Sequence, residues 1–372
     1  MKKTIIAASI AAVMSAPAMA ELTVYGKVHM GVGSSTENVA LTGHGATTDA
    51  FGKGTTAQEL DDFVTGYNGK NDNKQVVDQA SRFGFKATED LGNGMKVFGQ
   101  LEFQTSVADG TSDGGIQDRD SFVGLSGDFG KVVVGNMAAP TKGMLYKLGN
   151  IHDADANNGY DAASTFESKG DRVANVVAYA NSFNGMNLTV ATVVGATDWT
   201  SATSMGLDYS INGLTIGGAV KNTDSATGED ITLVGAKYTM GDLTVGIVNE
   251  QTDNITGLFG VSSMIVAGEG DLDNTMISAS YKMGNNTLAM SYSEADAKID
   301  AAGTSADDYE GTLTAETFNV SLSHALSKSA KIYVAHTTQD ISGTLDNQSS
   351  TSDPSVASGG RDMTSVGISY SF

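Results

Sequence analysis

The chain has 372 residues, enough for two average soluble domains or for one large closed sheet. It carries 22 Lys and Arg against 43 Asp and Glu, a formal charge of −21, which argues against nucleic acid as a partner because phosphate binding needs a basic surface. Cysteine is absent, so disulfide scaffolds, thiolate metal sites and thiol nucleophiles are excluded together.

The first 20 residues have the layout of a cleaved secretory signal. Lysines at positions 2 and 3 precede a short apolar run, and Ala18-Met19-Ala20 supplies the small residues of a cleavage site. An uncleaved membrane anchor would need a longer apolar span. We therefore predict a signal peptide at 1–20 and one mature unit, without a second domain, at 21–372. No other stretch approaches the roughly 18 apolar residues of a membrane helix, but an exported chain can also enter a membrane as a closed barrel.

From residue 21 onward the sequence repeats one pattern, two alternating arms joined by a tight turn of Gly, Asn or Asp. Single strands are expected at 21–33 and 362–372. Between them lie seven hairpins, at 81–104, 119–136, 171–195, 204–221, 231–250, 276–294 and 316–337. Two strands per hairpin plus the two single strands give about 16, an even number that is typical of bacterial outer-membrane barrels.

Alternation gives each strand one apolar and one polar face. In the last strand Val366, Ile368 and Tyr370 oppose Ser365 and Ser369. Soluble sandwiches also alternate, but there the polar face should carry many Lys and Glu, whereas here it is rich in Gly, Ser, Thr, Asn and Gln, and charges concentrate in the loops. We therefore predict an all-β fold, a transmembrane antiparallel β-barrel of about 16 strands with short periplasmic turns and long external loops.

Several segments together resemble the general, non-specific trimeric porins of the Gram-negative outer membrane. They are "LTVYGKV", "SRFGFKATEDLGNGMKVFGQLEF", "RDSFVGLSGDFGKVVVGN", "DRVANVVAYANSFNGMNLTVATV" and the terminal "VGISYSF". The resemblance implies a homotrimer of 16-stranded barrels, each with its own pore narrowed by a third external loop that folds inward. It also implies that Phe372 is part of an assembly signal.

Porins of this kind place basic residues on the barrel wall, opposite acidic residues on the inward loop. By local motif, the resemblance assigns the wall to Lys27, Arg82, Arg119 and Arg172. Lumen-facing cations repel one another and persist only where counter-charge or water compensates, so their presence there indicates function. The alternative is that each side chain lies at a strand end and extends to lipid headgroups.

The long segment 137–170 is the expected inward loop. Its candidate constriction acids are Asp153, Asp155, Asp161 and Glu167. The segment lacks a Pro-Glu-Phe-like acidic tip and also carries Lys142, Lys147 and His152, so it departs from the family pattern. Acids that merely solvate an exposed loop are an equal alternative.

Other chemical motifs fail on inspection. The stretch from Asp153 begins like a calcium loop, but Asn158 and Ser164 stand where Gly and Glu belong, so we predict no metal and no cofactor. The five histidines have no ligand spacing, and the residues around Ser126 do not form the nucleophile motif of a hydrolase. We therefore expect no enzyme.

The sequence predicts an outer-membrane porin, a water-filled channel for passive diffusion of ions and small hydrophilic solutes through a charged constriction. From the acidic total charge we expect a weak cation preference and external loops bridged by divalent cations to lipopolysaccharide. Two alternatives stay open. A sugar-specific channel would need an aromatic slide, although aromatics are only 7% of the chain. A non-conducting adhesin could use long external segments at 34–77, 251–273 and 340–360.

Overall fold

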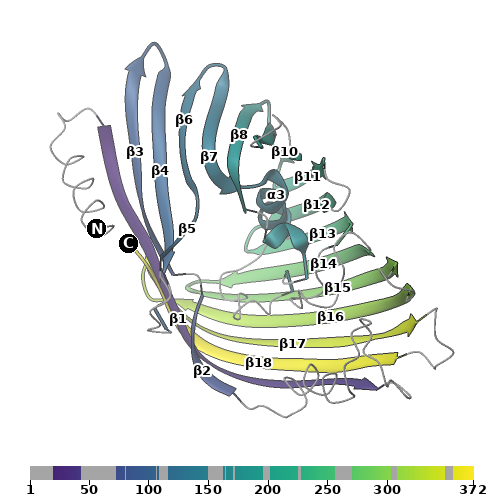
Figure 1. Cartoon of the computed structure of the whole chain (residues 1–372). Helices are drawn as coiled ribbons and strands as arrows, with labels where there is room; N and C mark the ends of the chain where they lie inside the picture. Colours follow the sequence, from purple (N-terminus) through teal and green to yellow (C-terminus); the bar gives the residue numbers. More distant parts are fainter. Residues whose placement is uncertain are drawn as a thin grey trace, which may run out of the picture.

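The computed structural model describes residues 20–42, 73–79, 81–105, 107–108, 116–149, 162–163, 165–170, 172–195, 202–224, 228–255, 270–302, 308–347 and 355–372. The strands form one antiparallel sheet that closes on itself (Figure 1). The first strand, β1 (Ala20–Thr42), pairs on one side with the last, β18 (Ser355–Ser371), and on the other with β2 (Asn73–Asp78) and β3 (Arg82–Gly92). Closure leaves no unpaired sheet edge, which lipid would not tolerate.

The other strands follow in chain order around the ring. They are β4 (Met95–Thr105), β5 (Ile116–Asp118), β6 (Ser121–Gly127), β7 (Gly130–Ala138), β8 (Arg172–Phe183), β9 (Met186–Val193), β10 (Ala202–Ile211), β11 (Leu214–Thr223), β12 (Asp230–Met240), β13 (Leu243–Asp253), β14 (Gly270–Met283), β15 (Asn286–Ala302), β16 (Asp308–Ala325) and β17 (Ala330–Asn347).

Two barrel strands are each interrupted, and each of them is therefore numbered as two strands. Both β2 and β3 pair with β1, and both β5 and β6 pair with β4. Counting each interrupted strand once reduces the 18 strands of the sheet to 16. The predicted strand number and the antiparallel order are therefore confirmed.

The short connections at one end of the barrel are the predicted tight turns. Asn184-Gly185 and Asn212-Gly213 both have positive φ, at 51° and 83° and at 49° and 83°. Two consecutive residues with positive φ form the hairpin turn whose twist matches that of the flanking strands, and Asn-Gly is its preferred sequence. We call this end of the barrel the turn end; it lies at the upper left of Figure 1.

The two faces of the strands divide as predicted. In β18, Val366 and Ile368 are 60% and 49% exposed on the outer surface, whereas Ser365 and Ser369 are 1% and 3% exposed and face inward. A soluble protein buries its apolar face, so this inverted arrangement is that of a barrel surrounded by lipid.

Several strands run further at the external end than predicted. The expected strand 21–33 extends to Thr42, and β17 and β18 reach Asn347 and Ser355, well inside the segments predicted as loops at 34–77 and 340–360. The prediction was wrong there because it followed apolar alternation. These extensions are rich in polar residues, which give no apolar alternation to follow.

The third external connection, between β7 and β8, folds into the barrel as the resemblance implied. It contains α3 (Pro140–Leu148) and the short 3-10 helix η1 (Glu167–Lys169). Pro140 occupies the first turn of α3, where its missing N–H is not needed. Figure 1 shows α3 inside the curve of the sheet, against β10–β13. Within the described parts of the chain, no helix is long and apolar enough to cross a membrane.

Candidate functional site

The two strands that flank β4 are broken at the same level of the wall, and two of the predicted arginines lie at the breaks. Arg82 follows the gap between β2 and β3, and Arg119 lies in the gap between β5 and β6. Irregular backbone bonds replace the ladder at these points: Thr105 N donates to the carbonyl of Ser81 at 2.9 Å, and Arg119 N donates to that of Glu102 at 2.9 Å. The breaks therefore place Arg82 at the start of β3 and Arg119 between two strand segments.

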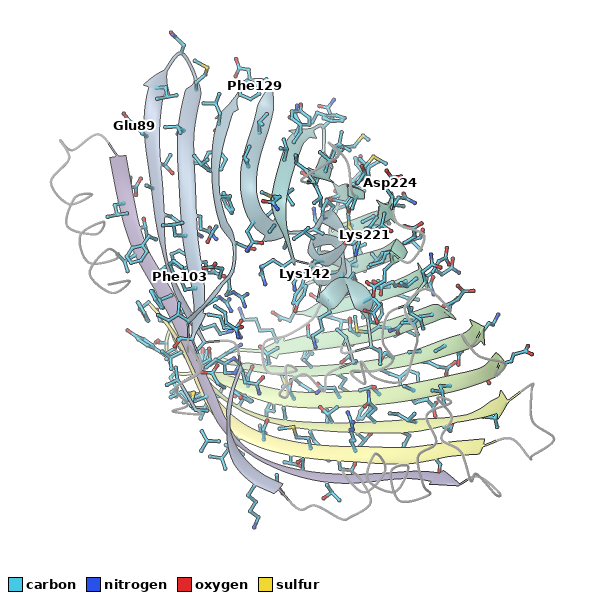
Figure 2. All side chains as sticks on the ribbon, in the orientation of Figure 1. Glu89, Phe103, Phe129, Lys142, Lys221 and Asp224 are labelled. Carbon is cyan, nitrogen blue, oxygen red and sulfur yellow. The ribbon has the colours of Figure 1, made fainter. Side chains whose placement is uncertain are left out.

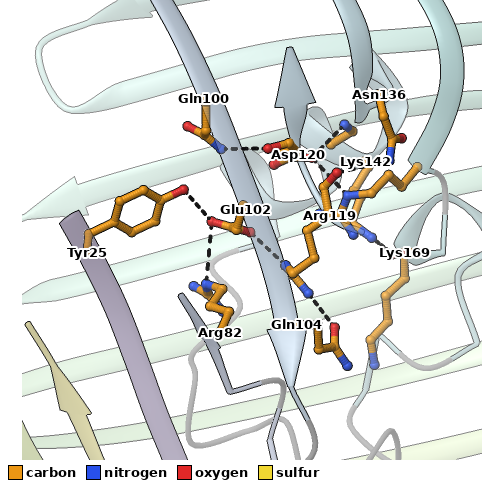
Figure 3. A network of polar contacts seen from close by, with 12 residues as sticks. Tyr25, Arg82, Gln100, Glu102, Gln104, Arg119, Asp120, Asn136, Lys142 and Lys169 are labelled. Carbon is orange, nitrogen blue, oxygen red and sulfur yellow. Dashed lines mark hydrogen bonds and ion pairs between the residues drawn. The ribbon is translucent and has the colours of Figure 1, made fainter. Parts of the chain in front are cut away.

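Glu102 on β4 is the centre of the resulting network (Figure 3). Arg119 donates through Nε to Glu102 Oε1 at 2.7 Å and through NH1 to Gln104 Oε1 at 2.7 Å. On the other side, Arg82 Nε lies 3.9 Å from Glu102 Oε2, and the Tyr25 hydroxyl donates to the same oxygen at 3.0 Å. Only 7% of Glu102 is exposed, so its charge is compensated by these partners rather than by bulk water.

Asp120 is the second carboxylate of the wall. Arg172 Nε donates to its Oδ1 at 2.8 Å, and the backbone N–H of Ala138 donates to the same atom at 3.2 Å. The backbone carbonyl of Asp120 accepts from Gln100 Nε2 at 3.3 Å. Together the two carboxylates hold three arginines side by side on one wall.

Lys27, the fourth predicted wall residue, is opposite Arg82 in the register of β1 and β3 and faces inward. It is 7% exposed. The structure therefore brings all four predicted basic residues to the same inner wall. None of the four extends outward to a lipid headgroup.

The loop adds further cations next to this wall. Lys142 of α3 donates through Nζ to the backbone carbonyl of Lys169, and Figure 3 shows both residues beside the Arg119 end of the network. The described part of the constriction is thus richer in cations than in carboxylates.

The opposite wall anchors the loop by apolar packing. Leu145 and Leu148 of α3 are fully buried. They belong to one cluster with inward-facing residues of four strands, namely Ala219, Leu233, Val248 and Met276. Burying this apolar interior patch against α3 removes apolar surface from water, which explains why the loop is held on that side.

Polar contacts complete the anchor. Ser278 Oγ donates to the carbonyl of Gly149 at 2.7 Å, and Asn274 Nδ2 donates to Thr165 Oγ1 at 2.7 Å. Further along, Lys147 Nζ lies 2.6 Å from Asp208 Oδ1. The loop is therefore tied to β10 and to β14 as well as packed.

Glu167, one of the predicted constriction acids, lies at this anchor and not at the arginine wall. Its backbone N–H donates to Oε1 of buried Glu250 at 2.8 Å, and the N–H of Ser168 also donates to that carboxylate, at 3.4 Å. Burial, with the nearby charges of Glu229 and Glu250, raises the pKa of Glu167 to about 8, although Lys221 opposes the shift. The other three acids, Asp153, Asp155 and Asp161, lie outside the described residues.

Acids and lysines of the strands are distributed unequally between the two faces of the sheet, whose side chains are drawn in Figure 2. On β13–β18 the exposed outer face carries acids beyond the apolar band: Asp253, Asp271, Asp273, Glu294, Asp296, Glu310, Glu316, Asp340 and Asp362. The inner face carries lysines on both sides of the barrel: Lys86, Lys96, Lys131, Lys221, Lys237, Lys282 and Lys331. The expectation that charges concentrate in the loops was therefore wrong, and the acidic total charge does not describe the lumen.

The C-terminal residue has a defined place in the barrel. Phe372 exchanges two backbone hydrogen bonds with Gly26 of β1, at 2.9 and 3.0 Å, as the last pair of the seam between the first and last strands. A Cβ on Gly26 would lie 2.4 Å from the Phe372 ring. The ring therefore fills a notch that only glycine leaves open.

Sequence reasoning missed the residues that position the arginines. No local spacing in the sequence connects Glu102 with Arg119, Asp120 with Arg172, or Tyr25 with Glu102. The only available signal was the polar face of the strand 95–105, on which Glu102 is the one carboxylate. Among the described residues, no group of three or more His, Cys, Asp or Glu could hold a metal ion.

Comparison with solved structures shows the same fold. The barrel superimposes on an anion-selective porin from Comamonas acidovorans with a TM-score of 0.64 and 20% identity, covering 95% of this chain and 100% of that one. It also superimposes on the trimer form of OmpT, an outer membrane protein of Vibrio cholerae, with a TM-score of 0.55 and 13% identity, covering 95% and 99%.

Sequence comparison agrees. The chain is 38% identical over 160 residues to the major outer membrane protein P.IB of Neisseria meningitidis serogroup B, a match that covers 43% of this chain and 40% of that relative. The sequence model of the Gram-negative porin family matches residues 7–344. The chain therefore belongs to the Gram-negative porin family and is an outer-membrane protein.

Proposed function

We propose that this barrel is a passive diffusion channel for ions and small hydrophilic solutes. A closed 16-stranded wall leaves an aqueous interior, and the inward loop narrows it. Selection would then come from the width of the constriction and from the charges that line it. Lys27, Arg82, Arg119 and Arg172 are its basic wall, and the acids of the segment 150–161 are candidates for the facing loop.

The observation that carries the proposal is the fixed row of arginines beside an anchored loop. Among the described residues of this region, the cations Arg82, Arg119, Arg172 and Lys142 outnumber the carboxylates Glu102 and Asp120. The charge of this described region is positive although the chain as a whole is acidic. We therefore propose a preference for anions, opposite in sign to the expectation from total charge, because charges at the narrowest point dominate selection.

The test is planar-bilayer recording of refolded protein, with the reversal potential measured in a KCl gradient. We expect large stepwise openings and a reversal potential that favours chloride. The triple variant R82Q/R119Q/R172Q should retain conductance and lose that preference, while K74Q/K298Q, which changes two outward lysines, should keep it. Silence from a correctly folded barrel would instead support a non-conducting adhesin. Strong block by a sugar would support the sugar-specific channel, and a cation preference would overturn the basic constriction.

The assembly that we propose is a homotrimer in contact with lipopolysaccharide. The outward acids of β13–β18 lie where headgroups begin, and some are directly opposite one another in register, such as Asp273 with Asp296 and Glu294 with Glu316. Like charges in opposite positions are destabilising, so bridging divalent cations would relieve them. Cross-linking tests the trimer, and loss of bound lipopolysaccharide on chelation tests the bridge.

Two further predictions concern maturation. Cleavage after Ala20 is checked by N-terminal sequencing of protein from outer membranes. The role of Phe372 in assembly is checked by deleting it and measuring barrel insertion, with Phe372→Trp as a control that keeps a terminal aromatic ring.

A further inference from the structure

The inner face of the barrel carries a second set of cations, far from the arginine wall. Five lysines lie within about four residues of the tight turns, on strands from both halves of the ring. They are Lys96 on β4, Lys131 on β7, Lys237 on β12, Lys282 on β14 and Lys331 on β17. We call this set the turn-end lysines.

Register shows that these side chains point into the lumen. Lys96 is four residues before Gln100, whose amide contacts the wall network. Lys96 is opposite Ser126 in the register, and Ser126 is opposite Lys131, so all three share a face. Lys282 is four residues after Ser278, which contacts the inward loop. Because side chains alternate strictly along an unbroken strand, residues four apart share a face.

The remaining two follow by the same rule. Lys237 is four residues after Leu233, which packs against α3. Lys331 is opposite Ser369, which in turn is opposite inward-facing His29. The turn-end lysines therefore surround the mouth rather than forming a patch on one side of it.

Carboxylates at this mouth do not cancel them. On the same inner face lie Glu21, Asp90 opposite Lys96, and Asp208, which is already paired with Lys147 of the loop. Lys86 lies one level deeper, with its Nζ 4.4 Å from the centre of the Tyr25 ring. The turns themselves add Asp128, Asp242 and Lys328. Among the described residues, cations exceed carboxylates at this mouth.

The external end is built differently. Among the described residues of β13–β18 at that end, the acids lie mainly on the outer surface, while the inner face carries neutral residues such as Thr252, Asn274 and Thr337 beside Glu250 and Arg361. A mouth with one sign of charge and low-dielectric walls concentrates the opposite ion, and the effect depends on ionic strength. The two mouths of this channel therefore differ in their electrostatics.

We propose that the turn-end lysines form an anion-concentrating ring at the periplasmic mouth, which makes the anion preference of the channel depend on which side is dilute. The inference rests on the proposed channel function. Small diffusible anions would be enriched at the ring without a fixed binding geometry. Anions arriving from the periplasmic side would then meet two successive positive regions, the ring and the arginine wall.

Screening provides the test. On the side with about 0.1 M KCl the Debye length is about 10 Å. On the side with about 1 M KCl the Debye length is about 3 Å, so the charges in contact with that solution are largely screened. Protein inserted in one orientation is recorded with the gradient in each direction. We expect the chloride-to-potassium permeability ratio to be about twofold higher when the turn end faces the dilute side.

Variants separate the ring from the constriction. K96Q/K131Q/K237Q/K282Q/K331Q should give the same ratio in both directions while keeping an anion preference from the arginine wall. A matched pair, K131Q/K282Q in the ring and K74Q/K298Q on the outer surface, makes the same change in charge, and only the first should reduce the asymmetry. Heat-modifiable gel mobility confirms that each variant is folded.

The possible outcomes distinguish failure of the ring from failure of the proposed channel function. An anion preference equal in both directions in the natural sequence removes the ring and leaves the proposed function intact. Asymmetry that survives all five substitutions also removes the ring. A cation preference in both directions removes the ring and the basic constriction together.

Discussion

The inward-facing strand residues differ in chemistry between the two opposite walls of the barrel. On the side of β3–β8, inward residues are charged, the strands are interrupted, and Glu102 and Asp120 hold three arginines. On the side of β10–β14, inward residues include Leu233, Val248 and Met276, which are buried against the loop. One wall presents charge to the lumen, and the other removes apolar surface from it.

The difference shows that a constriction needs both walls. A charged row selects ions only if something holds the passage narrow beside it, and a loop stays in place only if it buries apolar surface on the far side. We propose that the arginine wall sets the sign of ion selection and that the anchoring wall sets the width of the passage. Changes to each wall should therefore alter different measurements.

The largest effect is expected from the anchoring wall. Leu145→Ala and Leu148→Ala remove fully buried side chains, each at a cost of about 2–5 kcal/mol in packing free energy. The double variant should show higher, noisier conductance and should admit larger sugars in a liposome swelling assay, with little change in the sign of selection. L91A, which alters an exposed turn, is the control. An unchanged size limit would contradict the anchoring role.

The second-largest effect is expected from the charged wall, and it should alter ion selection rather than the size limit. Glu102→Gln keeps the shape of the side chain and removes its charge, so Arg82 and Arg119 lose their shared counter-ion. The permeability ratio should shift towards anions by about threefold, because a pore-lining charge of this kind changes the local potential by about kT. The size limit should stay the same. A shift towards cations would show that Glu102 does not face the ion path.

An intermediate effect should depend on pH through Glu167. Its pKa is about 8 in the docked loop against 4.5 ordinarily. The docked state therefore binds the proton more tightly, so docking is strongest below the ordinary pKa and weakens as the pH rises towards about 8. Conductance fluctuations should increase over that interval and level off above it.

Glu167→Gln is the matched variant for this dependence. It cannot ionise beside Glu229 and Glu250, so its fluctuations should not change with pH over the same interval. Persistence of the full pH dependence in this variant would assign it to another group.

The smallest effect is expected from Tyr25→Phe. The substitution removes the hydroxyl that donates to Glu102 at 3.0 Å and costs about 0.5–1.5 kcal/mol, the net value of one hydrogen bond. A small shift in reversal potential should accompany a slightly lower melting temperature. Tyr179→Phe, whose hydroxyl contacts the turn carbonyl of Phe129, should change stability alone. Equal reversal potentials in the two variants would make the role of Tyr25 purely structural.

Local sequence was enough to predict the elements of the barrel. Apolar alternation located the hairpins, and Asn-Gly pairs such as Asn184-Gly185 located their turns, because strand pleat and positive φ are properties of neighbouring residues. The arginines were also predicted, but only through resemblance of their local motifs. The strand ends beyond residue 33 were missed since polar residues there carry no apolar signal.

Tertiary structure alone decided which residues form the site. Glu102 meets Arg82 and Arg119 only through the pairing register of adjacent strands, and the loop meets β13 only because the closed ring brings distant parts of the chain around it. It also decided which charges of the described strands face the lumen. The sequence by itself determined a closed barrel with a total charge of −21. In the described strands, folding places many of the acids outside and most of the lysines inside, because alternation assigns each charge to a face that composition does not reveal.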